Sequence, residues 1–291
     1  MDTQRTPTAD QIRTAWDGLA SGFDEFVTPE TASIAQETLR ILDLQPGMRL
    51  VDVAAGTGAL SFPAARTGAH VVATDISPVM IDLLNDRARA EGLANVEGRA
   101  MDGTALDLEA DTFDVAVSVN GVSLFPDLPT SLAEMVRVTK PGGRVVLVSF
   151  GPPPAVEFIG FVMGAMKAEV PGFTPLPVDP PPLPFQVADP DVMRSRLTEA
   201  GLSEVSVHRS TCHMSFDSAE RLLTTFMFSN PIGARFVAEL TAEQKSAVEQ
   251  RLAGMLKDRA GEQGRSGDQS GSDNRGAELH CAVNIGVGIV S

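Results

Sequence analysis

The sequence predicts an α/β fold: a doubly wound, mostly parallel sheet with helices on both faces. Short apolar runs alternate with helical segments of about 10–15 residues, the pattern of βαβ units with right-handed crossovers. The first apolar run ends in a turn of small residues that contains Gly56 and Gly58, and a helical pattern follows directly. The last run, 278–290, is extended and follows helical segments, so it can pair antiparallel with the run 203–216.

The composition limits the class of protein. The 291 residues suffice for one large domain or two small ones, and 43% of them are hydrophobic, as in a globular core. The net charge of −15 argues against a nucleic-acid partner. No stretch is apolar for long enough to span a membrane. Cys212 and Cys281 are the two cysteines, as suits a reducing compartment, and the first residues lack an apolar signal core, so we expect a cytoplasmic protein.

The expected elements follow one another in a regular order. Strands are expected at 50–53, 71–75, 95–100, 113–119, 144–150, 203–216 and 278–290. Helices are expected at 9–19, 29–44, 78–92, 126–138, 156–168, 189–200, 218–228 and 241–257. Apolar residues at helical spacing support the helices, and capping signals such as Ser77 before Pro78 mark where they start.

The pattern divides the chain into four segments. Residues 1–45 form N-terminal helices that either pack as a cap on the core or close as a lid over the site, and 46–150 form the ligand-binding core. Residues 151–188 are rich in proline and form an irregular substrate cap with one short helix. Residues 189–291 complete the core, with a helical insertion at 218–258, a mobile loop at 259–276 and a closing strand.

The glycine turn alone is a weak signal. Glycines between a strand and a helix let backbone N–H groups approach a ligand closely. A dinucleotide fingerprint would place a third glycine or alanine at position 61, counting from Gly56, where this chain has Ser61. A nicotinamide cofactor is therefore unsupported by the turn, although the turn does not exclude it.

Three acidic positions make the interpretation more specific. Asp52 lies inside the first strand, where a buried carboxylate needs a partner such as a ligand's ammonium group. Asp75 ends the second strand, 19 residues after Gly56, where an acid can accept hydrogen bonds from both hydroxyls of a ribose. Asp102, after Met101, can contact a purine, or it can simply start a surface turn. The order of the three favours a nucleoside ligand.

Five segments, taken together, resemble the successive motifs of class I S-adenosylmethionine (SAM)-dependent methyltransferases, and within them the ubiquinone/menaquinone-biosynthesis subgroup, also called methyltransferase type 11. They are Val51–Gly58, Ala73–Ser77, Met101–Gly103, Phe113–Ser118 and Val138–Arg144. The resemblance covers residues 10–150 and returns in the final strand at 281–288. One position departs from it, because Ala54 stands where the family usually has glycine; we expect only a slight change in the turn.

The resemblance implies a seven-stranded Rossmann-like sheet whose last two strands form an antiparallel hairpin, with SAM as the cofactor. It places Trp16 and Phe23 over the cofactor as a lid. The residues assigned to cofactor binding, from the motifs and the resemblance together, are Asp52, Ala54, Gly56, Gly58, Asp75, Ile76, Met80, Met101, Asp102, Gly103, Val119 and Asn120.

Catalytic and substrate-binding residues are harder to assign. Methyl transfer needs a base only if the acceptor loses a proton, and His208 and His213 are the weak candidates. No metal site is expected, because strand alternation places His208 and Cys212 on one face and His213 on the other. The side chains that can line an apolar pocket, or alternatively form a second core, are Phe158, Phe161, Met163, Phe185 and Phe226.

The sequence thus predicts SAM-dependent methyl transfer by in-line displacement to a small, apolar or aromatic metabolite. Two alternatives stay open. One is a nicotinamide-dependent oxidoreductase, and the other is a SAM-binding protein that transfers no methyl group, because a fold does not fix a function. The acceptor atom and the oligomeric state are not readable from the residues.

Overall fold

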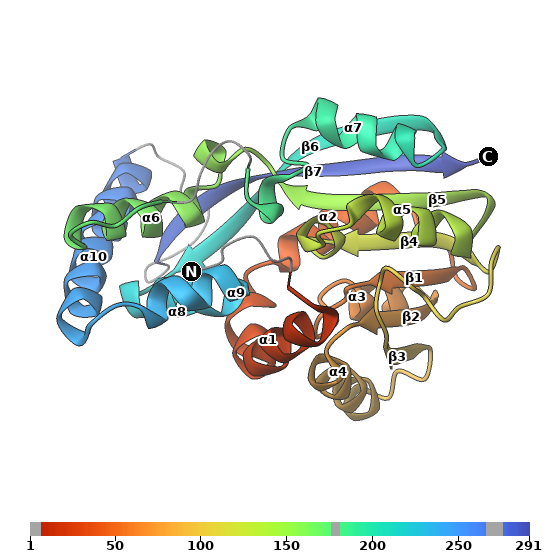
Figure 1. Ribbon diagram of the computed structural model, residues 1–291, viewed down its shortest axis with the longest axis horizontal. Coiled ribbons are helices and arrows are strands. Elements are labelled where there is room, and N and C mark those ends of the chain that lie inside the picture. Colours follow the sequence, from red (N-terminus) through yellow and green to blue (C-terminus); the bar gives the residue numbers. More distant parts are fainter. Residues whose placement is uncertain (1–6, 176–180, 266–275) are drawn as a thin grey trace.

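The computed structural model describes residues 7–175, 181–265 and 276–291, and it contains a seven-stranded sheet (Figure 1). The strands are β1 (Arg49–Val53), β2 (His70–Asp75), β3 (Val96–Ala100), β4 (Phe113–Val119), β5 (Thr139–Phe150), β6 (Leu202–Phe216) and β7 (Ala277–Val290). Their order is β3-β2-β1-β4-β5-β7-β6. Strands β1 to β5 pair in parallel, and β7 runs antiparallel to both β5 and β6. The predicted fold class, including the closing hairpin, is confirmed.

Helices cover both faces of the sheet. The helices of the central layers are α2 (Ala32–Leu42), α3 (Ser61–Arg66), α4 (Pro78–Glu91), α5 (Leu128–Val138) and α7 (Pro190–Glu199). Along β1, Leu50 faces a core that also holds residues of α2, α3 and α4, whereas Val51 and Val53 face a core shared with α5 and α7. A central parallel strand must bury both of its faces in this way, which is why its sequence is a nearly continuous run of apolar residues.

Capping residues fix where the helices begin. The Ser77 hydroxyl accepts a hydrogen bond from the backbone N–H of Met80 and so starts α4, as predicted. Asp127 and Asp189 cap α5 and α7 through the same kind of contact. Within the described ranges, no helix combines the length and the apolar character that crossing a bilayer requires.

The two antiparallel strands extend beyond the rest of the sheet. β5 pairs with β7 only as far as Phe150 opposite Val283, whereas β6 continues to pair with β7 as far as Phe216 opposite Ala277. Residues 211–216 and 277–282 therefore form a two-stranded ribbon, which we call the arm, about 20 Å long at the usual rise per residue.

The arm supports a cap made of α6 (Glu157–Glu169), α8 (Ala219–Ser229), α9 (Pro231–Ala238) and α10 (Ala242–Arg265) (Figure 1). The ring of Phe158 in α6 stacks on Phe216 of the arm, with centroids 5.9 Å apart. Leu279 and Cys281, on the same side of the ribbon, are fully buried. A two-stranded ribbon is marginal alone, so this apolar packing stabilises the arm.

The N-terminal segment consists of α1 (Ala9–Gly22) and the short π-helix η1 (Phe23–Val27). Three single-turn 3₁₀ helices complete the described elements: η2 (Val122–Leu124), η3 (Pro153–Ala155) and η4 (Leu183–Phe185). The irregular, proline-rich segment predicted for 151–188 contains η3, α6 and η4.

Two expectations for the second half need correction. The predicted mobile loop at 259–276 is wrong for its first residues, because α10 continues to Arg265; residues 266–275 lie outside the described ranges. An ion pair of 2.5 Å between Arg259 and Glu157 of α6 anchors the end of α10. The helix α9 was not predicted; Asn230 caps it by accepting hydrogen bonds from the backbone N–H groups of Ile232 and Gly233.

Candidate cofactor-binding site

The glycine loop, residues 54–60, leaves the carboxyl end of β1, which is where ligands bind in doubly wound folds. Ala54, Gly56 and Gly58 have φ angles of 57°, 56° and 92°, all in the left-handed region. A side chain at Gly58 would meet the ring of Phe62 at 2.7 Å, so glycine is required there. Ala54 takes the left-handed conformation although it carries a Cβ, at a cost of about 1–2 kcal/mol.

Asp75 connects β2 to this loop. Its carboxylate accepts hydrogen bonds of 2.9 Å from the backbone N–H groups of Gly56 and Ser77, one on each oxygen. Burial raises the pKa of Asp75, and the two backbone donors act against that shift. Each carboxylate oxygen has a second lone pair, so Asp75 can hold the loop and still accept a hydrogen bond from a ligand hydroxyl.

Asp52 is a buried acid beneath the same loop. Its side chain is 1% exposed and accepts a hydrogen bond of 2.6 Å from the hydroxyl of Ser61. Burial, with a smaller contribution from the negative charge of Asp75, raises the pKa of Asp52 to about 7. Over the described part of the chain, no lysine or arginine forms an ion pair with it. A cationic group of a ligand would therefore favour its ionised form.

The N-terminal segment lies against the loop. A methyl group in place of the Gly56 hydrogen would be 3.2 Å from the ring of Phe23, so this ring lies on the loop. Trp16 packs edge-to-face on Phe23, with ring centroids 6.1 Å apart. Asp17 accepts a hydrogen bond of 2.6 Å from the hydroxyl of Ser77, the residue that also donates to Asp75. Phe23 therefore lies on the glycine loop and Trp16 lies behind it, which is the position that a lid over a ligand at this loop requires.

Two more contacts hold this segment in place. The side chain of Asp24 in η1 pairs with Arg87 of α4 at 2.6 Å, and both side chains are partly buried. The hydroxyls of Thr28 and Thr57 are 2.9 Å apart, which joins the end of η1 to the glycine loop. The sequence indicated a possible lid but not these polar contacts, because their partners are separated by tens of residues.

The remaining predicted cofactor residues surround the same edge of the sheet. Asp102 accepts hydrogen bonds of 2.8 Å from the N–H and hydroxyl of Thr104, the contacts of an ordinary turn. Gly103 is packed between Phe125 and Val53. Asn120, just after β4, has a φ of 52°. Of the others, Met80 is fully buried in α4, whereas Ile76, Met101 and Val119 are half-buried.

The side chains predicted to line a substrate pocket divide into two groups. Phe158 and Phe226 are nearly fully buried and contact each other in the core of the cap, with centroids 6.0 Å apart. Phe161 and Met163 are half-buried against that core, and Phe185 is buried in η4. For Phe158 and Phe226 the structure thus matches the alternative, a second core.

One contact that holds η4 at the site was not predicted from the sequence. The side-chain amide of Gln186, which follows η4, donates hydrogen bonds to the backbone carbonyls of Ser123 at 2.6 Å and Phe125 at 3.0 Å. Those two residues belong to the segment after β4, next to Asn120. Gln186 therefore holds the proline-rich segment above the carboxyl edge of the sheet. The only signal in the sequence was a polar residue between two apolar ones.

The histidines considered as bases have other partners. The ring of His208 lies 3.3 Å from the hydroxyl of Ser206, and the ring of His213 lies 3.0 Å from the carboxylate of Glu278. All four residues belong to β6 and β7. Nothing in these contacts gives either histidine a catalytic role.

Taken together, the site suits a nucleoside with a cationic tail. The left-handed glycines allow close approach, Asp75 has free lone pairs, and Asp52 is a buried carboxyl that pairs with no lysine or arginine among the residues that the structure describes. These are the groups that the ribose and the ammonium of SAM require, so the residues fit the predicted cofactor.

Known proteins support this interpretation. Residues 50–143 match the family model described as a methyltransferase domain. The nocamycin O-methyltransferase of Saccharothrix syringae is 32% identical over 253 residues, which cover 80% of this chain and 86% of that enzyme. A demethylmenaquinone methyltransferase of Streptomyces avermitilis is 34% identical over 154 residues, which cover 51% of this chain and 64% of that enzyme.

Other similarities are narrower or concern the fold alone. An uncharacterized protein of Mycobacterium tuberculosis is 40% identical over 105 residues, and this chain spans only 38% of its length. A putative methyltransferase from Bacillus halodurans superposes with a TM-score of 0.54 at 19% identity, covering 88% of this chain and 98% of that one. A [4+2]-cyclase superposes with a TM-score of 0.56 at 15% identity, covering 98% and 97%.

Proposed function

Because this chain belongs to the class I SAM-dependent methyltransferases, we propose that it transfers the methyl group of SAM to a small, apolar or aromatic metabolite. The observation that carries the proposal is the joint arrangement at the end of β1. There, Asp75 and the glycine loop are hydrogen-bonded to each other, and Phe23 lies on that loop.

The chain's own residues have separate tasks in this proposal. Bound SAM supplies an electrophilic methyl group on a sulfonium sulfur. Asp75 would accept hydrogen bonds from the ribose hydroxyls, and Asp52 would pair with the ammonium, directly or through water. Trp16 and Phe23 exclude water, because an in-line displacement gains most from alignment and a dry site. No catalytic base is assigned.

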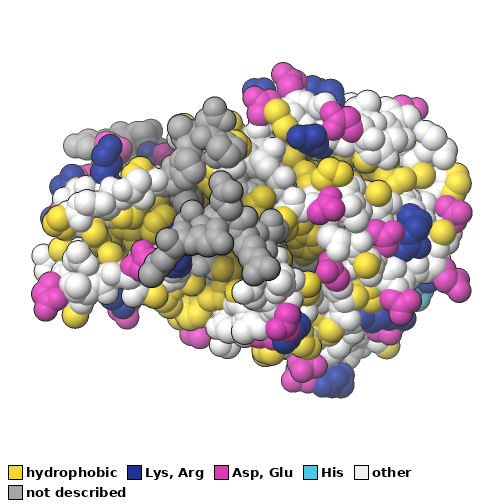
Figure 2. All heavy atoms as spheres, viewed as in Figure 1, with side chains coloured by type: hydrophobic (Ala, Val, Ile, Leu, Met, Phe, Trp, Pro, Cys, Tyr) yellow, Lys and Arg dark blue, Asp and Glu magenta, His cyan; other side chains and the backbone are white. Residues whose placement is uncertain are grey.

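The choice of acceptor class rests on the cap. Its helices present apolar side chains, and Figure 2 shows hydrophobic groups gathered on the face over α6 and α8. The rings of Phe26 in η1 and Phe228 in α8 stack with centroids 5.9 Å apart, so apolar contact continues from the cap to the lid. The names of the relatives, nocamycin and demethylmenaquinone methyltransferases, also indicate small organic acceptors.

Calorimetry and a labelled donor test the proposal. Titration with SAM, S-adenosylhomocysteine and NAD is expected to show binding of the two sulfur nucleosides only. Incubation with methyl-labelled SAM and a metabolite extract should then yield a labelled small molecule, whose structure identifies the acceptor atom. Heat from NAD alone would favour the oxidoreductase alternative. SAM binding with no labelled product from any extract would favour a SAM-binding protein that transfers no methyl group.

We expect Phe23→Ala to weaken SAM binding by roughly tenfold. The ring lies on Gly56 and is only partly buried, so removing it exposes the loop to water at a cost of about 1.5 kcal/mol of apolar burial, which corresponds to about tenfold in affinity. The matched control is Phe173→Ala, which removes a half-buried ring that packs on Phe236 in the cap. Isothermal titration of both variants is the measurement. An equal SAM affinity in Phe23→Ala and the parent chain would remove Phe23 from the lid.

A further inference from the structure

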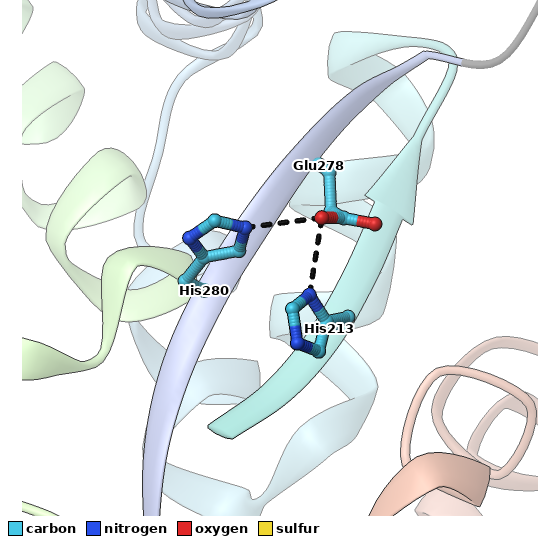
Figure 3. A group of neighbouring side chains, drawn as sticks. All are labelled: His213, Glu278 and His280. Atoms are coloured by element: carbon cyan, nitrogen blue, oxygen red, sulfur yellow. Dashed lines mark hydrogen bonds and ion pairs between the residues drawn. The ribbon is translucent and has the colours of Figure 1, made fainter. Parts of the chain in front are cut away.

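The exposed face of the arm brings together two histidines and a glutamate (Figure 3). His213 on β6 is directly opposite His280 on β7, and Glu278 precedes His280 by two residues, on the same face of the strand. The carboxylate of Glu278 is 3.0 Å from Nδ1 of His213 and 3.0 Å from Nε2 of His280. The three atoms that could bind a metal all lie within 4.8 Å of one another.

The donor set is the one that zinc and its neighbours prefer. Two imidazole nitrogens and a carboxylate oxygen suit Zn²⁺, Ni²⁺ or Cu²⁺, whereas Mg²⁺ and Ca²⁺ prefer oxygen alone. Bonds of about 2.0–2.2 Å in a tetrahedral site place the ligand atoms about 3.4 Å apart, and the carboxylate oxygen here is 3.0 Å from each imidazole nitrogen. The side chains are 44–50% exposed, which leaves room for water at a fourth position.

The backbone around the cluster is held from two helices. The backbone N–H of His280 donates a hydrogen bond of 2.7 Å to Glu157 of α6. Arg259 of α10 pairs with Glu157 at 2.5 Å and also donates to the carbonyl of Glu278 at 3.3 Å. Glu157 therefore neutralises the charge of Arg259, so Arg259 does not repel a cation bound at the cluster. A fixed scaffold reduces the cost of ordering metal ligands.

A single carboxylate oxygen of Glu278, Oε1, contacts both imidazoles, at 3.0 Å each. A bound cation would replace these contacts, because the two imidazoles and the carboxylate would then each bind the cation.

We propose that His213, Glu278 and His280 form a zinc site that joins the two strands of the arm. The site is separate from the glycine loop and does not depend on the proposed methyl transfer. This site was not predicted, because the neighbours of His213 on its own strand do not include its partners. Its partners lie 65 and 67 residues away and meet it through the antiparallel register.

Zinc titration with matched variants tests the site. We expect the parent chain to bind one Zn²⁺, with an affinity that falls at least about tenfold in His280→Ala and in Glu278→Gln. The matched control is His208→Ala, which removes another exposed histidine from the same strand and should leave zinc binding unchanged. The same concentration of Zn²⁺ should raise the melting temperature of the parent chain and of His208→Ala by equal amounts, and that of the other two variants by less.

Cobalt spectra distinguish this site from the buried thiols. Cys212 and Cys281 are opposite each other on the other face of the arm, and a thiolate ligand would add an intense charge-transfer band to bound Co²⁺. We expect a Co²⁺ spectrum without that band, abolished in His280→Ala. Circular dichroism and SAM affinity equal to the parent's show that the variant is folded. Equal zinc affinity in all variants, a thiolate band, or no binding by the parent chain would each overturn the proposal.

Discussion

Asp75→Ala is expected to weaken SAM binding by about 1–3 kcal/mol, which is roughly 5- to 150-fold, and to destabilise the chain. The first effect is the loss of hydrogen bonds to the ribose. The second follows from the structure: the backbone N–H groups of Gly56 and Ser77 both donate to this carboxylate, and both would lose their acceptor. A buried donor without a partner costs about 1–3 kcal/mol, so the free energy of unfolding should fall by several kcal/mol.

The control for this prediction is Asp127→Ala. Asp127 also accepts two hydrogen bonds, from the N–H and the hydroxyl of Thr130, but it caps α5 and is exposed. The substitution Asp127→Ala should lower the free energy of unfolding by about 1 kcal/mol and leave SAM affinity unchanged. Urea unfolding and calorimetry measure the two quantities. If both variants bind SAM as the parent chain does, Asp75 is a structural residue alone.

Asp52→Asn is expected to make the cofactor-free chain more stable at neutral pH. The folded-state pKa of Asp52 is about 7, above the ordinary value of 3.8, so between about pH 4 and pH 7 the folded state binds more protons than the unfolded state. The free energy of unfolding therefore falls as pH rises through that window. The shift of about three pKa units corresponds to about 4 kcal/mol, and above pH 7 the free energy of unfolding of the parent chain is lower by that amount. An asparagine can still accept the hydrogen bond from Ser61 without carrying this penalty.

The same variant should bind SAM more weakly, since the ammonium loses its carboxylate. Stability and cofactor affinity are thus expected to change in opposite directions. Urea unfolding at pH 5 and pH 8 should show a steeper decline with pH in the parent chain than in Asp52→Asn. Identical pH profiles would mean that Asp52 does not titrate in this range, and tighter SAM binding would contradict its role beside the ammonium.

The sheet was predictable because its physical cause is local. A strand buried on both faces must be a short apolar run, and the runs at Leu50–Val53 and Phe113–Val119 show this. The site was predictable in part for the same reason. Gly58 and Asp75 are each required by the turn they occupy, and both positions are visible in the sequence.

The cap was less predictable because pocket walls and cores share a composition. Phe158 and Phe226 could equally contact an apolar ligand or pack on each other in a core. Only the three-dimensional packing distinguishes these two roles. Contacts between distant polar residues were invisible as well. Nothing near Asp17 indicates that it meets Ser77, and nothing near Glu157 indicates that it fixes the end of α10.

The length of β6 and β7 has a consequence for how such an enzyme can diversify. The strands pair with each other beyond the edge of the sheet, and α8, α9 and α10 all lie in the sequence between Phe216 and Ala277, which are paired at the tip of this ribbon. A graft at that tip would exchange α8, α9 and α10 for another helical unit while the strand order and the glycine loop keep their positions. Chimeras joined at Phe216 and Ala277 would show whether acceptor choice is inherited with the graft.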